Sequence, residues 1–440
     1  MADALPRISV FGLGRLGAPL AACLASQGYH VLGVDVDPAK VKALQEGQAP
    51  VYETGLQDLI AQHKTHLRAT TDCAAGARDS EISFIVTATP SESEGGFSLR
   101  YVLPLCESIG RELAKKNTYH LVVLTSTVMP GATGGPVRAA LERASGKQAG
   151  KDFGLCYSPE FIALGSVIRD FLNPDFVLIG ESDPRAGDAL QAVYDRVCNK
   201  PQAARMNWVN AELTKLAVNT YVTTKISYAN MLAAICSRLQ GADVDVVTSA
   251  LGLDSRIGKK YLKGALGYGG PCFPRDNKAF SALGRKLEVP ALLAEATDYT
   301  NNEVVRRLAG QIEQVRCEHD TIGILGLTYK PNTDVVEAAQ GLLLAQMLSQ
   351  GQYPVLVYDP AGMANARREL KDGVRFADSM AECAHTSDVL VITTPWDEFR
   401  ALSPEEVRRT GKPRVIIDGW RILNAEAFRA VAEFVAVGKG

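Results

Sequence analysis

Three glycines near the start of the chain, Gly12, Gly14 and Gly17, constrain the fold more than any other feature. They lie between a short apolar run at residues 8–12 and a stretch with helical spacing at 15–27. Residues 31–35 predict a second strand, so the whole segment is typical of a βαβ unit. A Gly-x-Gly-x-x-Gly turn at this place lets a dinucleotide pyrophosphate approach the backbone at a helix N-terminus.

Asp35 ends the second predicted strand, 18 residues after Gly17. A carboxylate there can accept both ribose hydroxyls of NAD and would repel the 2′-phosphate of NADP. We therefore predict NAD as the cofactor, with Leu16 at the glycine turn and with Lys40 placed to soften the preference. The alternative interpretation is a glycine turn kept only for packing in a Rossmann-like sheet.

The rest of the chain alternates between strand-like and helical patterns. Apolar runs predict strands at 82–88, 121–125, 154–157 and 176–179, and thus a doubly wound parallel sheet up to about residue 200. Residues 211–239 contain no Gly or Pro and predict helix. A second α/β pattern starts at residue 321, and its SDVLVITTP is similar to DSEISFIVTATP of the first half. Two related sheets would explain this similarity, but buried strands can also converge on it.

The predicted fold class is therefore α/β, with two Rossmann-like doubly wound domains joined by a helical central region. We place an NAD-binding domain at 1–205, a central helical region with a cysteine loop at 206–310, and a C-terminal α/β domain at 311–440.

Composition excludes several function classes. The formal net charge of -2 gives no electrostatic reason to expect nucleic acid or an anionic membrane as partner. No apolar run approaches the length of a membrane span, and the N-terminus lacks a signal-peptide pattern, so we expect a cytoplasmic protein. The nine cysteines are scattered, without CxxC pairs or His partners at metal spacing. They predict neither a disulfide framework nor a metal site, and most of them should be small buried hydrophobes.

One cysteine stands in a different context. The stretch GYGGPCFPRD at 267–276 holds three glycines, two prolines and Cys272, and it predicts a constrained loop rather than a helix or a buried strand. We expect the glycines to permit close approach of a ligand to the backbone, and the prolines to limit the entropy of the loop.

Several spaced motifs together resemble one known family. They are the Ser-Thr-Val at 126–128 followed by Pro-Gly at 130–131, SPEF at 158–161, KLAVN at 215–219, DSRIG at 254–258, GYGGPCFPRD, LGLTYKPNTD at 325–334 and DGWR at 418–421. Their order and spacing resemble the nucleotide-sugar 6-dehydrogenases, the UDP-glucose and GDP-mannose dehydrogenase family, over nearly the whole chain. Members of that family oxidise a sugar C6 alcohol to a carboxylate in two hydride transfers to NAD. The resemblance implies that the central region at 206–310 also serves dimerisation and that the domain at 311–440 binds the UDP of the nucleotide-sugar.

The resemblance implies a catalytic set with chemically suitable members. An aldehyde loses hydride readily only after a nucleophile adds, and a cysteine thiolate can then form a thioester that water cleaves. Cys272 matches that nucleophile, and Lys215 and Asn219, four residues apart on one helix face, match the groups that stabilise the developing oxyanion. Without the resemblance, we would expect an exposed lysine and a solvated asparagine. Glu160 matches the glutamate that guides the hydrolytic water, Asp276 an aspartate that positions a relay water, and Thr127 a threonine near cofactor and substrate.

Binding residues are implied in the same way. Thr89, Pro90 and Ser126 match positions that line the cofactor. The implied substrate contacts are Phe161, Arg256, Tyr261, Lys263, Tyr268, Gly269, Lys330 and Arg421. Arg256 matches an arginine that family dimers donate across the interface, so a homodimer or higher homo-oligomer is expected. For Lys330 and Arg421, ordinary surface charge is an equally good interpretation.

The chain departs from the family pattern at three positions. Leu164 stands where a second glutamate is common, Glu337 where an arginine approaches the cofactor, and Met231 where a glutamate is frequent.

UDP-glucose is the favoured substrate, with GDP-mannose or a UDP-N-acetylhexosamine as alternatives. A non-catalytic nucleotide-sugar sensor would be expected to lose the nucleophile first, and a two-electron dehydrogenase of small hydroxy acids would need neither the cysteine loop nor a second α/β domain.

Overall fold

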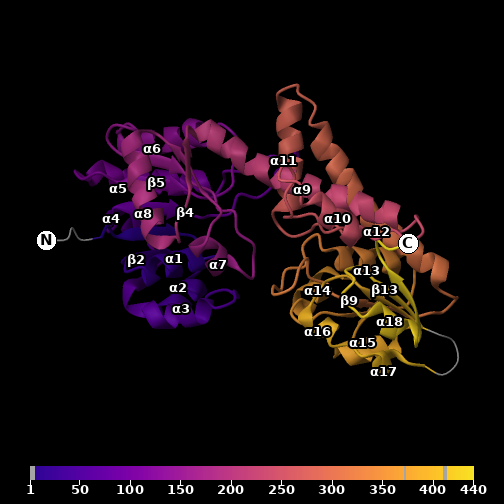
Figure 1. The fold of residues 1–440 in the computed structure, drawn as a ribbon. Helices are drawn as coiled ribbons and strands as arrows, with labels where there is room; N and C mark the ends of the chain where they lie inside the picture. Colours follow the sequence, from indigo (N-terminus) through magenta and orange to yellow (C-terminus); the bar gives the residue numbers. More distant parts are fainter. Residues whose placement is uncertain (1–4, 371–372, 410–413) are drawn as a thin grey trace. The chain divides into compact units, whose positions relative to one another are not determined.

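The computed structural model describes residues 5–370, 373–409 and 414–440. The chain divides into two compact units, with the boundary between Ala217 and Val218. Each unit contains one sheet with helices on both of its faces (Figure 1). Among the described helices, none combines the length and the apolar character that a membrane span requires.

The sheet of the first unit has eight described strands in the order β3-β2-β1-β4-β5-β6-β7-β8. Neighbouring strands are parallel except β6 and β7, which are antiparallel. The predicted doubly wound sheet is thus confirmed, but its far edge reverses direction, which apolar runs alone do not reveal. The strands are β1 Ile8–Phe11, β2 Val31–Val34, β3 Leu67–Thr70, β4 Ile82–Ile85, β5 Leu121–Leu124, β6 Gly154–Tyr157, β7 Val177–Glu181 and β8 Ala203–Met206.

Helices cover this sheet on two sides because crossovers between parallel strands alternate between its faces. Leu24 of α1, Ile60 of α3 and Leu190 of α8 belong to the core on one face. Ile109 of α5 and Leu141 of α6 belong to the core on the other face. The helices are α1 Gly17–Ser26, α2 Pro38–Gln45, α3 Leu56–His63, α4 Cys73–Arg78, α5 Val102–Lys115, α6 Arg138–Ser145, α7 Val167–Leu172 and α8 Pro184–Val197.

The second unit repeats the strand order of the first. Its sheet runs β11-β10-β9-β12-β13-β14, all parallel, which matches the order of the first six strands of the other sheet. The similar sequences noted above form β4 and β12, and each lies beside the first strand of its own sheet. The strands are β9 Ile322–Leu325, β10 Val355–Tyr358, β11 Val374–Phe376, β12 Val389–Ile392, β13 Arg414–Asp418 and β14 Ala432–Ala436.

Two cores also flank the second sheet. Leu308 and Leu344 belong to one, and Cys383 and Phe399 to the other. The helices around this sheet are α13 Gln340–Gln350, α14 Met363–Glu369, α15 Met380–Thr386, α16 Asp397–Arg400, α17 Pro404–Val407 and α18 Ala425–Arg429.

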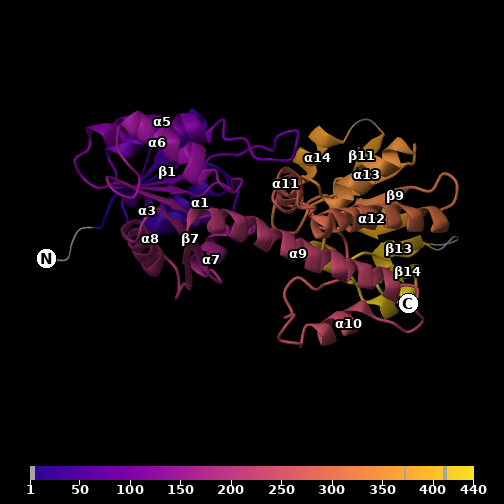
Figure 2. The ribbon, with the colours of Figure 1, turned by 90° about the horizontal axis from the view of Figure 1, so that it is seen from above.

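The middle of the chain is helical, as predicted. Figure 2 shows α9 as one continuous helix, Trp208–Cys236, and it is followed by α10 Val244–Leu251, α11 Phe273–Lys286 and α12 Leu292–Val315. The expectation that GYGGPCFPRD forms no helix is wrong for its second half, because α11 begins at Phe273. Pro274 is tolerated there since the first turn of a helix has no use for its missing N–H.

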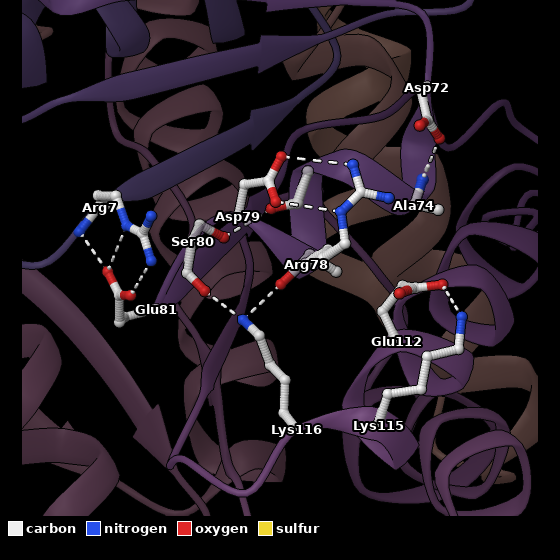
Figure 3. A network of polar contacts seen from close by, with 12 residues as sticks. Arg7, Asp72, Ala74, Arg78, Asp79, Ser80, Glu81, Glu112, Lys115 and Lys116 are labelled. Atoms are coloured by element: carbon white, nitrogen blue, oxygen red, sulfur yellow. Dashed lines mark hydrogen bonds and ion pairs between the residues drawn. The ribbon is translucent and has the colours of Figure 1, made fainter.

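Lys116 of the first unit donates hydrogen bonds to backbone carbonyls at and after the end of α4. The Lys116 Nζ donates to the carbonyl of Ala77, near the C-terminal end of α4, over 2.5 Å and also to the carbonyl of Ser80 (Figure 3). Next to it, the guanidinium of Arg7 pairs with Glu81 at 2.7 Å. A cation at this place satisfies carbonyl groups that a helix C-terminus leaves unpaired.

The same lysine contacts a buried histidine. His120 is 1% exposed, and its Nδ1 lies 3.0 Å from Lys116 Nζ while its Nε2 lies 2.9 Å from Ser83 Oγ. Because the ammonium can only donate, Nδ1 accepts and Nε2 carries the proton. Burial and the Lys116 charge lower the pKa of His120 to about 3. The ring is therefore neutral in the folded protein at neutral pH.

This burial predicts a loss of stability in mild acid. An unfolded histidine takes up a proton below about pH 6.5 while folded His120 does not, so stability falls as the pH drops from 6.5 toward 3. The variant His120→Gln removes the titrating group. We expect its stability deficit relative to wild type, measured by urea denaturation, to shrink by about 2 kcal/mol between pH 7.5 and pH 5. His319→Gln, at an exposed histidine, is the control. A deficit that stays constant with pH would contradict this account.

Candidate active site

The glycine turn after β1 has the geometry that a dinucleotide site requires. Gly12 has a φ of +101°, and a Cβ there would lie 2.6 Å from the Val86 carbonyl oxygen. A Cβ on Gly17 would lie 1.8 Å from the Gly12 carbonyl oxygen, so this glycine lets α1 pack against the turn. A Cβ on Gly14 would meet nothing within 4 Å. Leu16, the residue that precedes α1, makes no side-chain cap. Open space therefore lies beside the N-terminus of α1, where a pyrophosphate would bind.

Asp35 follows β2 and faces this turn. Its carboxylate accepts hydrogen bonds from the Leu13 N–H at 2.6 Å and the Asp37 N–H at 2.9 Å. Lys40 Nζ lies 3.7 Å from one of the same oxygens. A carboxylate has about four acceptor positions, so capacity remains for a ribose hydroxyl. The residues present thus fit the adenosine half of NAD.

The second unit contains a similar glycine turn, but its acidic residue is fully hydrogen-bonded within the protein. Gly326 has a φ of +111°, and a Cβ on Gly341 would lie 1.9 Å from its carbonyl oxygen, as in the first turn. Asp359 follows β10 as Asp35 follows β2. It accepts hydrogen bonds from the N–H groups of Leu327 and Thr328 at 2.7 and 2.9 Å, and from two more N–H groups of the next turn. With these bonds and 1% exposure, Asp359 has no capacity for a ribose.

Two loops at the carboxyl ends of β4 and β5 hold each other in place. Ser126 Oγ donates to the Thr87 carbonyl at 2.6 Å, and Thr89 Oγ1 donates to the Thr127 carbonyl at 2.7 Å. Pro90 follows in the same segment and is half-buried. Ligands of such sheets bind beyond the carboxyl ends of the strands, so the predicted cofactor residues lie at the expected edge.

A glutamate that the sequence interpretation missed fixes the loop after Thr127. Glu212 of α9 is fully buried, and its carboxylate accepts the N–H groups of Gly131 at 2.6 Å and Thr133 at 2.7 Å. Burial raises its pKa. Glu212 lies one helical turn before Lys215 on α9. A carboxylate among the apolar positions of this helix was the sequence signal that could have indicated a buried structural role.

Lys215 is neither exposed nor solvated. It is 7% exposed, and its Nζ donates to the carbonyl oxygen of Glu160 over 2.6 Å. The same Nζ lies 4.5 Å from the ring centroid of Phe161, which itself packs on Phe176. The lysine is therefore held at the SPEF turn that follows β6, and the expectation of an exposed lysine is excluded.

The carboxyl of Glu160 points into the protein. Its Oε1 has no hydrogen-bond partner and no contact with solvent. Burial raises the pKa of Glu160 to about 7, although Lys215 and Tyr194 act in the opposite direction. Leu164, in the turn that follows, is partly buried.

In the second unit, Asn219 and Asp276 form a buried pair. Asn219 Nδ2 donates to Asp276 Oδ2 over 2.6 Å, and Asp276 is 1% exposed. The guanidinium of Arg275 lies 3.5 Å from the other carboxylate oxygen. This places the two predicted catalytic residues side by side, within one turn of the start of α11.

Cys272 precedes the first residue of α11, and its side chain is exposed. Negative charge on its sulfur would be favoured by the positive end of the helix dipole. The next residue, Phe273, lies edge-on to the rings of Tyr261 and Tyr268, with centroids 6.4 and 6.3 Å away. Most other cysteines are buried, as expected: Cys23, Cys106, Cys156, Cys198, Cys236 and Cys383.

The glycines before Cys272 approach the protein itself. A Cβ on Gly269 would lie 2.4 Å from the Ala338 carbonyl oxygen, and one on Gly270 would lie 2.8 Å from the Tyr329 ring. The Gly270 N–H donates to the Glu337 carbonyl at 2.8 Å, while the Glu337 side chain is exposed. These glycines thus fit the cysteine loop against residues 329–340, and the expectation that they also let a ligand approach stays a prediction.

Two asparagines hold the same loop, and the sequence interpretation assigned no role to either. Asn230 of α9 accepts from the Ala265 N–H at 2.8 Å and donates to the Leu266 carbonyl at 3.0 Å. Asn301 of α12 accepts from the Tyr268 N–H at 2.7 Å and donates to the Tyr268 carbonyl at 3.0 Å. Each amide thus pairs with the backbone as a neighbouring strand would.

Two side chains that were predicted to contact the substrate, Tyr268 and Arg421, form hydrogen bonds within the protein instead. The Tyr268 hydroxyl donates to Asp298 over 2.6 Å. The Arg421 guanidinium makes a bidentate pair with Asp245 at 2.7 and 2.8 Å and donates to the Val437 carbonyl. Its side chain is 5% exposed, so it is not an ordinary surface charge.

The remaining predicted substrate residues are more accessible. Arg256 is largely exposed and pairs with Asp254 at 2.6 Å. Lys330 is half-buried, with its Nζ 5.9 Å from the Tyr329 ring centroid. Tyr261, with a left-handed φ of +62°, and Lys263 are exposed. Their contact with a nucleotide-sugar stays a prediction.

These observations define the class of protein. The first unit has the turn, the helix and the carboxylate of an NAD-binding domain, and the second presents an exposed thiol one helical turn from a buried amide–carboxylate pair. Within the described ranges, no group of three or more His, Cys, Asp or Glu side chains could hold a metal ion. The class is a nicotinamide-dependent oxidoreductase.

Comparison with known proteins identifies the family. Models of the UDP-glucose/GDP-mannose dehydrogenase family match its NAD binding domain at residues 6–198, its central domain at 209–303 and its UDP binding domain at 323–425. The chain therefore belongs to this family of NAD-dependent nucleotide-sugar 6-dehydrogenases, which confirms the resemblance predicted from the motifs and NAD as cofactor.

Individual relatives cover almost the whole chain. The UDP-glucose 6-dehydrogenase AglM of Haloferax volcanii is 36% identical over 94% of this chain and 97% of its own length. A GDP-mannose 6-dehydrogenase of Pseudomonas syringae pv. tomato is 31% identical, over 94% and 95%. The solved UDP-glucose dehydrogenase of Pyrobaculum islandicum has a TM-score of 0.91 and 32% identity, with 100% and 99% of the two chains covered.

Proposed function

We propose that the protein oxidises the C6 alcohol of UDP-glucose to the carboxylate of UDP-glucuronate, through a thioester on Cys272. The observation that carries this proposal is the exposed Cys272 thiol at the start of α11, with the buried Asn219–Asp276 pair one turn further on. UDP-glucose is favoured because the UDP-glucose relative is 36% identical, against 31% for the GDP-mannose relative.

The first oxidation converts the alcohol to an aldehyde. The glycine turn and Asp35 would hold NAD, which would supply the hydride acceptor for C6, and the hydroxyl proton leaves through a base. Asp276 is buried and ionisable, and it is hydrogen-bonded to Asn219, so it is suited to receive that proton through a water. Lys215 carries the cation that stabilises the oxygen as negative charge develops on it.

The second oxidation needs the thiol. The Cys272 sulfur would add to the aldehyde carbon and form a thiohemiacetal. Loss of a second hydride, for which a second NAD would supply the acceptor, would leave a thioester on the sulfur. Water then adds to the thioester carbon, the carbon–sulfur bond breaks, and the acid and the thiol are released. In total, one alcohol, two NAD and one water give one carboxylate, two NADH and three protons.

Glu160 is suited to the hydrolytic step. Because its pKa is raised to about 7, about half of the carboxyl groups are ionised at neutral pH and able to accept a proton from water. The protonated half can return the proton to the departing sulfur. A carboxyl with an ordinary pKa would be a weaker base for this step.

The stoichiometry of NADH tests the proposal. With purified protein and limiting UDP-glucose, we expect two NADH for each sugar and UDP-glucuronate as the product. Cys272→Ala should reduce the rate of acid formation by more than about a hundredfold, since the nucleophile acts as part of one catalytic unit. Cys317→Ala removes the other exposed thiol of the same unit and should leave the rate unchanged. GDP-mannose and UDP-N-acetylglucosamine complete the substrate panel.

Two outcomes would contradict it. A ratio near one NADH per sugar would indicate a simple alcohol dehydrogenase. Equal rates for Cys272→Ala and wild type would indicate that the thiol takes no part in the chemistry, as in a nucleotide-sugar sensor.

We also propose that the protein forms a homodimer through the exposed side of α9. Tyr221, Tyr228, Met231 and Ile235 of α9 are large exposed apolar residues, and they follow one another at seven-, three- and four-residue spacing. Such spacing produces a continuous apolar stripe along a helix. A second copy of the chain is the occupant that a self-complementary stripe favours.

Sedimentation velocity tests the dimer. The chain has a mass of 47.2 kDa, so a dimer sediments at 2 × 47.2 = 94.4 kDa. Tyr228→Asp combined with Ile235→Lys should shift the population to monomer, while Val36→Lys, an exposed apolar residue of the first unit, should not. A wild-type monomer at micromolar concentration would contradict the proposal.

A further inference from the structure

The Glu160 carboxyl lacks the hydrogen bonds that a buried carboxylate normally has. Its Oε1 is buried without a partner, while the Lys215 ammonium donates to the backbone carbonyl of the same residue instead. An ionised carboxylate in such surroundings is costly unless some donor reaches it. The ionised form of Glu160 therefore needs a hydrogen-bond donor from a neighbouring side chain.

Tyr194 is the donor that the fold provides. It lies on α8, is 2% exposed, and its hydroxyl is 2.7 Å from Ser158 Oγ. Ser158 is only two residues before Glu160, on the same turn after β6, and it is also fully buried. Tyr194 lowers the pKa of Glu160, which is the direction expected of a nearby hydroxyl that can donate to the carboxylate. The three side chains thus form a short polar group inside an otherwise apolar core.

The other groups that face Glu160 do not offer an equivalent hydrogen bond. Cys23 of α1 and Cys198, which follows α8, interact with its charge, and burial raises the pKa of both thiols, so they stay neutral and donate weakly. Lys215 of α9 attracts the carboxylate through its charge, but its ammonium donates a hydrogen bond to the Glu160 backbone carbonyl. The hydroxyl pair therefore determines how well the ionised form is held.

We propose that Tyr194 and Ser158 are positioning residues for Glu160, and that they supply the hydrogen bond that its ionised form needs during hydrolysis. This inference rests on the role proposed above for Glu160. When Glu160 is ionised, Tyr194 donates to the carboxylate and Ser158 donates to the Tyr194 oxygen. When Glu160 is protonated, its own O–H can donate to the Tyr194 oxygen, and the Tyr194 hydroxyl then donates to Ser158. Hydroxyl groups permit both directions because each can donate and accept.

A titration without substrate tests this inference. The side-chain carboxyl ¹³C resonance of Glu160 in the labelled protein is assigned by its loss in Glu160→Gln, and its midpoint is followed from pH 5 to pH 9.5. Removing a donor to the ionised form raises the midpoint. We expect Tyr194→Phe to raise it by about one pH unit, and Ser158→Ala to raise it by less.

A matched control separates this effect from loss of packing. Tyr29 is another tyrosine of the same core and is also 2% exposed. Tyr29→Phe should leave the Glu160 midpoint unchanged, whatever it does to stability. An unchanged midpoint in Tyr194→Phe, or an equal shift in Tyr29→Phe, would overturn the inference.

The same variants distinguish this inference from the proposed reaction. In Tyr194→Phe, the ascending limb of the pH profile of kcat for UDP-glucose oxidation should move upward with the midpoint, while KM changes little. If the midpoint shifts and the kcat profile does not, Tyr194 still positions Glu160, and it is the proposed role of Glu160 in hydrolysis that fails.

Discussion

The buried polar residues of α9 are the constraint on which the candidate site depends. Four of them form hydrogen bonds to segments that carry the motifs. In the first unit, Glu212 bonds to the loop after Thr127 and Lys215 to the SPEF turn. In the second unit, Asn219 bonds to Asp276 of α11 and Asn230 to the loop before Cys272. Each of these bonds satisfies a group that would otherwise be buried without a partner, at a cost of about 1–3 kcal/mol. Within each unit, the helix thereby fixes segments from distant parts of the sequence.

The two sheets use one backbone device in two ways. In each, a glycine with positive φ follows the first strand, and a later glycine lets the helix approach its carbonyl oxygen. The difference lies in the acidic residue after the second strand. Asp35 retains acceptor capacity, whereas the hydrogen bonds of Asp359 are all made within the protein. The first turn is therefore suited to bind the ribose of a dinucleotide. In the second turn, the aspartate serves to hold the backbone of the turn itself.

Much of the fold could be predicted from the sequence because it depends on local patterns. Apolar runs between glycines and helical stretches marked most of the strands, and the uninterrupted spacing at 211–239 marked α9. The reversal at β7 could not be predicted, since the direction of a strand depends on the path of the connection before it. The start of α11 inside the cysteine motif was also missed, because two prolines and three glycines weighed against helix although one proline occupies its first turn.

Side-chain partners were the least predictable part of the site. Arg421 pairs with Asp245, 176 residues away in the sequence, and nothing local indicates that contact. Glu160 was recognised from its motif, but the direction of its carboxyl follows from the packing of α1, α8 and α9 around it. Asn230 and Asn301 were assigned no role, because an asparagine that pairs with a loop backbone has no sequence pattern of its own.

The central claim is that Cys272 bonds covalently to the sugar during the second oxidation. Mass spectrometry of the Glu160→Gln variant, quenched in acid after incubation with UDP-glucose and NAD, tests it most directly, because slow hydrolysis should let the thioester accumulate. The account predicts a peptide that contains Cys272 and carries the mass of the UDP-glucuronyl group, and no such adduct in Cys272→Ala. NADH formation by Glu160→Gln without any adduct on Cys272 would contradict it.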